Sequence, residues 1–287
     1  MGCAQWPIAL AALWLSLIPA FLSAASAEGI ETRLHEKLIT VTVQGNAIQV
    51  GVLSKASPHD SPSNLAVLLP GYPSVVKPQV EGHQLVKSSL MGNFLIRARR
   101  HLVSEQVATL IVDCKSTIGL TCTAAYQASP DRQQDVQRLI DQVREELPSV
   151  RNVWLVGTSM GTISSSFMPR HAPAGTYQGV IHTAAITEPH AKNSYLELVD
   201  FDYRRVNLPQ FLIHHRDDPC PLTTWDGAKR LSKRFNLPLI TVLGGSDFKG
   251  KPCAAFTEHG FRGMEKNVMN AIKQIMSGGS ITDNEIK

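Results

Sequence analysis

The sequence lacks several features that mark other classes of protein. It has no run of like charges, no Gly-, Ser- or Pro-rich stretch within residues 28–287, and no internal repeat. Repeats would indicate a solenoid or propeller, and a low-complexity stretch would indicate a linker between domains. The formal net charge is +4, but no basic stripe with interleaved aromatic residues is present, which argues against nucleic acid as a partner. We therefore expect residues 28–287 to form a single domain with charges spread over a solvated surface.

Charge is absent from the start of the chain. Residues 1–27 hold an apolar run without a charged side chain and finish in small residues, as at a signal-peptide cleavage site. A membrane anchor is the alternative to a signal peptide. The absence of Lys or Arg near the start of the chain departs from the usual signal peptide, which has a basic first segment. Pro7 and Pro19 bracket an apolar run shorter than the roughly 20 residues of a bilayer span. We expect cleavage and export to the periplasm or the outside of the cell, without a stable membrane span.

Cysteine is scarce, and Cys3 lies within the predicted signal. The other four are Cys114, Cys122, Cys220 and Cys253. An even number in an exported chain suggests two disulfides, and four cysteines can pair in three ways. Proximity favours Cys114 with Cys122, which leaves Cys220 for Cys253. No CxxC or His-rich spacing accompanies them, so no metal site is predicted.

Short runs rich in Val, Ile and Leu recur along the chain and predict strands. Most of the later runs are unbroken, which is typical of parallel strands buried on both faces. The first two runs predict an antiparallel hairpin through residues 44–46. The runs are LITVTV from Leu38, IQVGVL from Ile48, LAVLL from Leu65, VATLIV from Val107, VWLV from Val153, GVIH from Gly179, FLIHH from Phe211 and LITVL from Leu239.

Helical patterns lie between these runs. The clearest covers residues 131–147, where Ser129 can cap the helix and Pro130 suits its first turn. Others begin near Thr224 and cover about 264–275. The alternation predicts an α/β fold, with a mostly parallel central sheet flanked by helices and an N-terminal β-hairpin.

One motif carries chemistry: GTSMG at residues 157–161. A bare GxSxG occurs by chance in roughly one chain in ten of this length. Here it follows a predicted buried strand and precedes a predicted helix, which is the context of a nucleophile elbow. The strained turn exposes the serine at the carboxyl edge of the sheet. We predict Ser159 as the nucleophile.

A serine nucleophile needs a histidine base and a carboxylate that orients it. In the fold that carries this elbow, the chain order is serine, acid, histidine. Asp218, with Asp217 as its competitor, follows the strand FLIHH, and His259 follows the last predicted strand. The aspartate pair could instead form a turn or cap before the nearby prolines. No other histidine follows Asp218, so His259 is the predicted base.

An oxyanion needs two backbone N–H donors, one of them from the residue after the nucleophile, Met160. The second is expected from LLPGYP at residues 68–73, whose prolines have no N–H. That leaves Gly71 or Tyr72, and we select Tyr72. The alternative is that this segment is a plain turn.

Together, LLPGYP, GTSMG, HHRDDP and EHGF resemble the α/β-hydrolase superfamily over most of residues 60–277. The likeness is to small exported bacterial hydrolases without a large lid, near the dienelactone hydrolases and polyester esterases. In their HGxxD pattern the acid stands three residues after the glycine. His215 replaces that glycine here, which implies Asp218, and Pro70 replaces a histidine often found before the oxyanion loop. A disulfide of Cys220 with Cys253 would then tie the acid loop to the base loop.

The resemblance implies acyl transfer to water, with a small-molecule ester or thioester as substrate and no cofactor or metal. Residues 187–208 leave room for only a short lid. His182 could line the pocket, but a core role is expected for it, and a core or loop role for His214 and His215. A peptidase, or a non-catalytic binding protein on the same fold, is the alternative. Oligomeric state is not predicted.

Overall fold

The central sheet is built from the runs of apolar and β-branched residues predicted as strands. The computed structural model describes residues 1–3, 33–188, 195–198, 200–278 and 284–287. Within them nine strands form one sheet, in the order β1-β2-β6-β3-β7-β8-β9-β10-β11. The strands are β1 (His35–Thr42), β2 (Ile48–Lys55), β3 (Asn64–Leu69), β6 (Val107–Val112), β7 (Asn152–Thr158), β8 (Gly179–Thr183), β9 (Gln210–His215), β10 (Leu239–Val242) and β11 (Glu285–Ile286).

The strand directions confirm the predicted arrangement. β1 pairs antiparallel with β2, and β2 pairs antiparallel with β6. The other pairings in this sheet, from β6 through β3 to β11, are parallel. The β1–β2 hairpin turns through Gln44–Asn46, where Gly45 has a φ of +72° that glycine adopts without strain.

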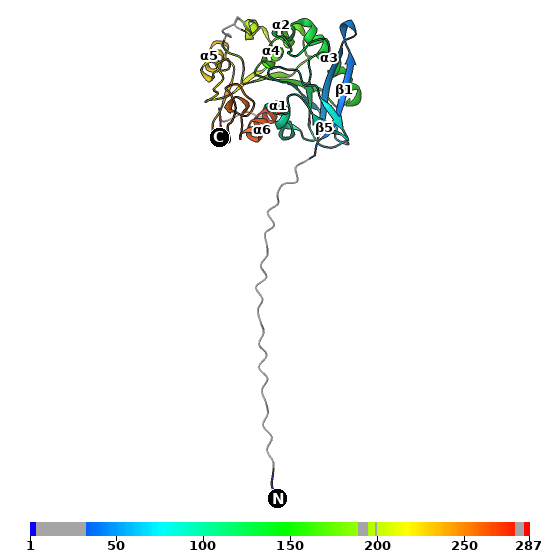
Figure 1. Ribbon diagram of the computed structural model, residues 1–287, viewed down its shortest axis with the longest axis vertical. Helices are drawn as coiled ribbons and strands as arrows, with labels where there is room; N and C mark the ends of the chain where they lie inside the picture. Colours follow the sequence, from blue (N-terminus) through cyan, green and yellow to red (C-terminus); the bar gives the residue numbers. More distant parts are fainter. Residues whose placement is uncertain (4–32, 189–194, 199, 279–283) are drawn as a thin grey trace. The chain divides into compact units, whose positions relative to one another are not determined.

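Helices cover both faces of the sheet, with α1 and α6 on one side and α3, α4 and α5 on the other (Figure 1). Successive side chains of β3 point to opposite faces of the sheet, and both faces are apolar. Ala66 and Leu68 pack toward α1 and α6, whereas Leu65 and Val67 pack toward α3 and α4. The helices are α1 (Phe94–Leu102), α2 (Ala124–Gln127), α3 (Pro130–Glu146), α4 (Gly161–His171), α5 (Trp225–Phe235) and α6 (Glu265–Met276).

The predicted helix starts are confirmed by their caps. The Ser129 hydroxyl accepts a hydrogen bond from the Arg132 N–H, and Pro130 occupies the first turn of α3. At α5, the Thr224 hydroxyl accepts from the Gly227 N–H. Each cap satisfies a backbone donor that the helix itself cannot pair.

A small second sheet was not predicted. β4 (Gln79–Glu81) pairs antiparallel with β5 (Gln84–Lys87) in the segment between β3 and α1. Its residues are mostly exposed or half-buried, so it lacks the apolar run that marks the strands of the main sheet. Between β8 and β9, the described residues form short 3-10 helices at Leu196–Leu198 and Tyr203–Arg205, while residues 189–194 and 199 lie outside the described part.

These elements all lie in residues 32–287, one of two units into which the chain divides. The other unit is residues 1–31, and the predicted signal peptide within it lies outside the described residues except for residues 1–3. In the part of the chain that is described, no helix is both long and apolar enough to cross a membrane.

Candidate active site

Ser159 lies at the sharp turn between β7 and α4. Its φ is +51°, a left-handed conformation that costs a non-glycine residue energy. The Ser159 N–H donates to the carbonyl of Thr183 on β8, at 3.1 Å. Because β7 lies between β3 and β8, the turn holds the serine at the carboxyl edge of the sheet, next to the ends of both strands.

The two glycines of the motif have no room for a side chain. A Cβ at Gly161 would lie 2.0 Å from the carbonyl oxygen of Leu69 and 2.6 Å from that of Pro70. A Cβ at Gly157 would lie 2.4 Å from the hydroxyl of Ser165. Real Cβ atoms do not approach so closely, so Gly161 is needed for the start of α4 to pack against the end of β3, and Gly157 for the end of β7 to pack against α4.

The loop after β3 passes directly beside the serine. A Cβ at Gly71 would lie 3.0 Å from the Cβ of Ser159. Within the described part of the chain, the backbone N–H groups of Tyr72 and Met160 donate no hydrogen bond. Both residues line the same cavity as Ser159. Two backbone donors are therefore free next to the serine, at the residues predicted to bind the oxyanion.

Buried polar contacts fix this loop. The Ser74 hydroxyl donates to the carbonyl of Pro70 at 2.8 Å. The Asp113 carboxylate, directly after β6, accepts from the N–H groups of Val76 at 2.6 Å and Lys77 at 2.9 Å. The loop is thus tied both to its own start and to a neighbouring strand.

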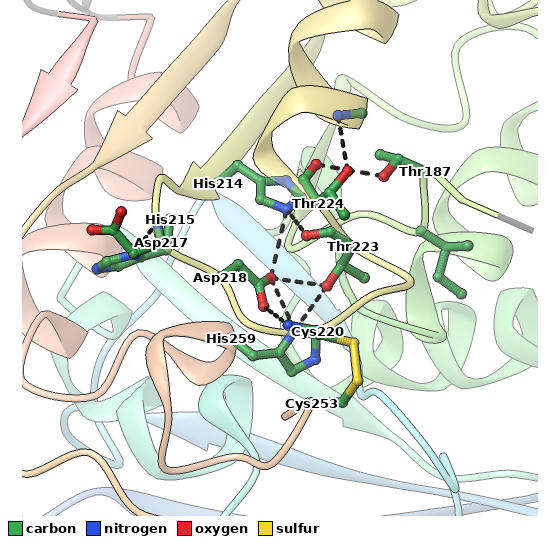
Figure 2. A network of polar contacts seen from close by, with 12 residues as sticks. Thr187, His214, His215, Asp217, Asp218, Cys220, Thr223, Thr224, Cys253 and His259 are labelled. Carbon is green, nitrogen blue, oxygen red and sulfur yellow. Dashed lines mark hydrogen bonds and ion pairs between the residues drawn. A yellow bond between two sulfur atoms is a disulfide. The ribbon is translucent and has the colours of Figure 1, made fainter. Parts of the chain in front are cut away.

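The two candidate acids after β9 point in different directions. Asp218 Oδ2 lies 3.0 Å from Nδ1 of His259, and the Asp218 side chain is fully buried. Asp217 is exposed, and its backbone N–H donates to Nδ1 of His215 at 3.1 Å. Figure 2 shows Asp217 turned away from His259. The structure therefore brings Asp218, and not Asp217, to the histidine.

Hydrogen bonds hold Asp218 as a carboxylate. Burial by itself raises the pKa of a carboxyl group, but the interactions with His214 and His259 outweigh it and hold the pKa of Asp218 well below its usual range. The Cys220 N–H also donates to Oδ1 at 2.9 Å. Since an ionised carboxylate can only accept, Nδ1 of His259 carries the hydrogen between them. In neutral His259, Nε2 is then the nitrogen that can take a proton.

Two neighbours of Asp218 were not predicted as site residues. The Thr223 hydroxyl donates to Asp218 Oδ2 at 2.8 Å and lies 3.0 Å from Nδ1 of His259. Nε2 of His214 lies 3.6 Å from the same carboxylate oxygen. Thr223 belongs to no motif, and His214, the first residue of HHRDDP, is expected from the sequence only to have a core or loop role. Their closeness in sequence to Asp218 is the one signal that could have singled them out.

Ser159 and His259 line one cavity of about 580 Å³. Its described lining contains no Asp, Glu, Lys or Arg, and Asp218 is not among the lining residues. The cavity therefore suits a neutral, largely apolar group. Its apolar side chains include Leu90, Phe94, Met160, Ile186, Leu222 and Ala255.

Protein-family models and curated protein sequences give no match to this chain. Solved structures do. An α/β serine hydrolase homologue from Coxiella burnetii matches with a TM-score of 0.55 at 11% identity, covering 83% of this chain and 96% of that one. A cold-adapted esterase from an Arctic intertidal metagenomic library matches with a TM-score of 0.53 at 13% identity, covering 84% and 94%.

The chain has the α/β-hydrolase fold. The acylaminoacyl peptidase of Pyrococcus horikoshii also matches, with a TM-score of 0.54 at 12% identity, covering 85% of this chain but 41% of that one. At such identities the likeness extends to the fold alone. The narrower resemblance to dienelactone hydrolases and polyester esterases stays a prediction.

Two disulfides cross-link this α/β-hydrolase fold, and their pairing is the predicted one. Cys114 is joined to Cys122, 8 residues along the chain. Cys220 is joined to Cys253, 33 residues along, so this bond links the loop of Asp218 to the loop of His259. Disulfides of this kind are typical of proteins in oxidising compartments.

The remaining histidines in question lie outside the cavity. His182, on β8 of the α/β-hydrolase sheet, is fully buried, and its Nδ1 lies 2.9 Å from the Ser165 hydroxyl. Burial lowers the pKa of His182 to about 4. Nε2 of His215 lies 2.8 Å from the Gly244 carbonyl. Within the described ranges, no group of three or more His, Cys, Asp or Glu side chains could hold a metal ion.

Proposed function

We propose that this chain is a serine hydrolase that cleaves carboxylic ester or thioester bonds through an acyl-enzyme intermediate. The observation that carries the proposal is the hydrogen bond between His259 and the buried Asp218 carboxylate, beside a cavity that His259 shares with Ser159. The strained turn at Ser159 and the free N–H groups of Tyr72 and Met160 support the same chemistry.

In the first half of the reaction, Nε2 of His259 takes the proton from the Ser159 hydroxyl as its oxygen attacks the carbonyl carbon of the substrate. The N–H groups of Tyr72 and Met160 stabilise the negative charge that develops on the carbonyl oxygen. The bond to the alcohol or thiol then breaks, and the leaving group takes the proton from His259.

In the second half, His259 takes a proton from water as the water oxygen attacks the acyl carbon. The bond to Ser159 breaks, the serine oxygen recovers the proton from His259, and the carboxylic acid is released. Asp218 remains ionised throughout and stabilises the protonated imidazole. These steps require no cofactor or metal.

The cavity favours an ester over a peptide substrate. A peptidase that acts near a chain end needs a side chain of opposite charge to bind the terminus, because an unpaired charge is costly to desolvate. The described lining holds no such charge. This supports an ester over a peptide with a free, charged terminus.

Labelling by a fluorophosphonate probe, together with hydrolysis of short-chain p-nitrophenyl esters, tests the proposal. We expect wild type to be labelled and active, and Ser159→Ala to be unlabelled. Asp218→Asn should lower kcat by about ten-thousand-fold, because an amide stabilises the wrong imidazole tautomer. Asp217→Asn is the matched control and should retain wild-type activity.

A folded wild type that is neither labelled nor active on esters would overturn the proposal and favour a binding protein. If peptides with a free or acylated end were cleaved faster than esters, the reaction class would stand but the substrate class would be wrong. Equal losses from the two aspartate variants would remove the assignment of Asp218.

A further inference from the structure

We propose that His214 and Thr223 are positioning residues, which together hold the Asp218 carboxylate in the orientation that His259 needs. The inference rests on the proposed function and extends it to two residues that the sequence does not predict as site residues. Figure 2 shows both side chains gathered around Asp218, on the side away from the exposed Asp217. Both are fully buried.

Thr223 contacts the acid and the base at once. Its hydroxyl has a single hydrogen, which it donates to Asp218 Oδ2 at 2.8 Å. The Thr223 hydroxyl oxygen also lies 3.0 Å from Nδ1 of His259. This nitrogen in turn lies 3.0 Å from Asp218 Oδ2. The three groups form a closed triangle, so movement of the carboxylate or of the imidazole disturbs contacts of Thr223.

His214 fixes Thr223 and faces the same carboxylate oxygen. Its Nε2 lies 2.6 Å from the Thr223 carbonyl, and a carbonyl only accepts, so Nε2 carries a hydrogen. The same nitrogen lies 3.6 Å from Asp218 Oδ2. Among the residues that the structure describes, none is a hydrogen-bond partner of the buried Nδ1 of His214.

The tautomer of His214 separates its role from that of His259. A ring protonated on both nitrogens would bury an unsatisfied N–H at Nδ1, which is unfavourable. The geometry therefore places a ring hydrogen of His214 on Nε2, next to the Thr223 carbonyl and Asp218 Oδ2. Two histidines flank one carboxylate, but only His259 lines the cavity.

These contacts restrict rotation of the carboxylate. The Cys220 N–H holds Oδ1 at 2.9 Å, while Thr223 and His214 lie on the side of Oδ2. Neither Thr223 nor His214 belongs to the described lining of the cavity. Loss of either donor should therefore lower kcat and leave KM nearly unchanged.

The test compares two pairs of variants in the full chain, with p-nitrophenyl acetate as substrate. Thr223→Val and His214→Leu remove the donors, whereas Thr223→Ser and His214→Gln retain one. We expect kcat to fall about 10- to 100-fold in the first pair. The second pair should recover most of this loss.

The pH profile adds a readout that a purely structural role would not move. The titratable side chains seen to contact the pair are Asp218 and His259. A change in how the carboxylate is held changes how well it stabilises the imidazolium, so the acid limb of kcat/KM should shift in Thr223→Val and His214→Leu.

The outcomes separate this inference from the proposed function. If wild type is unlabelled and inactive, the proposed function fails first. If wild type is active and the folded Thr223→Val protein keeps its kcat and pH profile, the inference alone is wrong. It is also wrong if Thr223→Ser and His214→Gln lose as much activity as their partners, because packing would then explain the loss. Thr223→Val is nearly isosteric, so it remains decisive if His214→Leu does not fold.

Discussion

The backbone of Ser159 is held in its left-handed conformation from several sides. Such a conformation costs about 1–3 kcal/mol in a non-glycine residue. The Ser159 N–H is bound by the Thr183 carbonyl, and the Ser159 carbonyl accepts from both the N–H and the hydroxyl of Thr162, at 2.9 and 2.6 Å. The contacts at Gly161 then determine how closely this turn can lie against the end of β3, and those at Gly157 determine how closely it can lie against α4.

Replacement of Gly161 by alanine tests that close approach. The new methyl group would meet two backbone carbonyls, which cannot move aside as a flexible side chain could. We expect the free energy of unfolding to fall by about 2 kcal/mol or more, and ester hydrolysis to be largely lost. Urea unfolding and steady-state kinetics measure the two effects.

Gly119→Ala is the control for that substitution. A Cβ at Gly119 would have nothing within 4 Å. This variant should match wild type in both measurements. A stable, active Gly161→Ala protein would show that the loop after β3 can shift without harm.

At this scale the sequence identifies a residue where a motif or elimination singles it out. Ser159 stands in a motif, and His259 is the last histidine left for its role. Residue patterns alone leave Asp217 and Asp218 open, because the direction of neighbouring side chains in a loop depends on backbone angles that composition does not encode. Thr223 has no pattern at all, since its contacts cross between two loops.

Among the elements, the loops after β9 and β10 depend on each other. Each contributes one partner of the Asp218–His259 hydrogen bond, and Cys220 and Cys253 connect them covalently. Both cysteines also line the cavity. The disulfide therefore limits drift between acid and base as well as stabilising the chain.

Removing that disulfide should affect stability and activity together. In the chain-entropy model, closing 33 residues is worth about 4 kcal/mol and closing 8 residues about 2.5 kcal/mol. We expect Cys220→Ser with Cys253→Ser to lower both Tm and kcat. The control, Cys114→Ser with Cys122→Ser, should lower Tm with a smaller effect on kcat. Unchanged Tm and kcat in the first double variant would contradict this account.

The elements that the sequence failed to predict are short or exposed. α1 covers only the nine residues Phe94–Leu102, too few to repeat a helical period of apolar residues more than about twice. β11 has two residues, and β4 and β5 lack an apolar run. Strands buried on both faces were predicted well because burial requires continuous apolar sequence.

At the scale of the whole molecule, stability depends on pH through buried groups. His182 has its ordinary pKa of 6.5 when unfolded and about 4 when folded. Between these pH values the unfolded chain binds more protons than the folded chain. The contribution of His182 to the free energy of unfolding is therefore complete above about pH 6.5 and falls as the pH drops. Although Asp218 is an acid, its contribution to the free energy of unfolding also falls as the pH drops, because its pKa is lowered in the folded protein. That contribution is lost only below about pH 4.

The His182→Gln variant isolates this term. Between about pH 7.5 and pH 5, the His182 contribution falls by about 2 kcal/mol. The free energy of unfolding of wild type should therefore drop more over this range than that of the variant, whatever the absolute stability of each. The free energy of unfolding of each protein is measured by urea titration at both pH values. An equal drop in wild type and variant would show that His182 is not protonated on unfolding.

We propose that the mature chain is residues 28–287, a single α/β-hydrolase domain. The two disulfides and the predicted signal support export, and the N-terminal residue of the secreted protein, read by mass spectrometry, would identify the cleavage point. Identities of 11–13% to proteins of the same fold indicate how little of this sequence the fold itself requires.

The pieces of the site are widely separated along the chain, from Gly71 through Ser159 to His259. During synthesis, a growing chain that has reached the serine still has no base to activate it. The proposed activity can therefore begin only after residue 259 has emerged and the last loop has closed on the sheet. During translation the site is therefore incomplete, and we expect the nascent chain to be inactive.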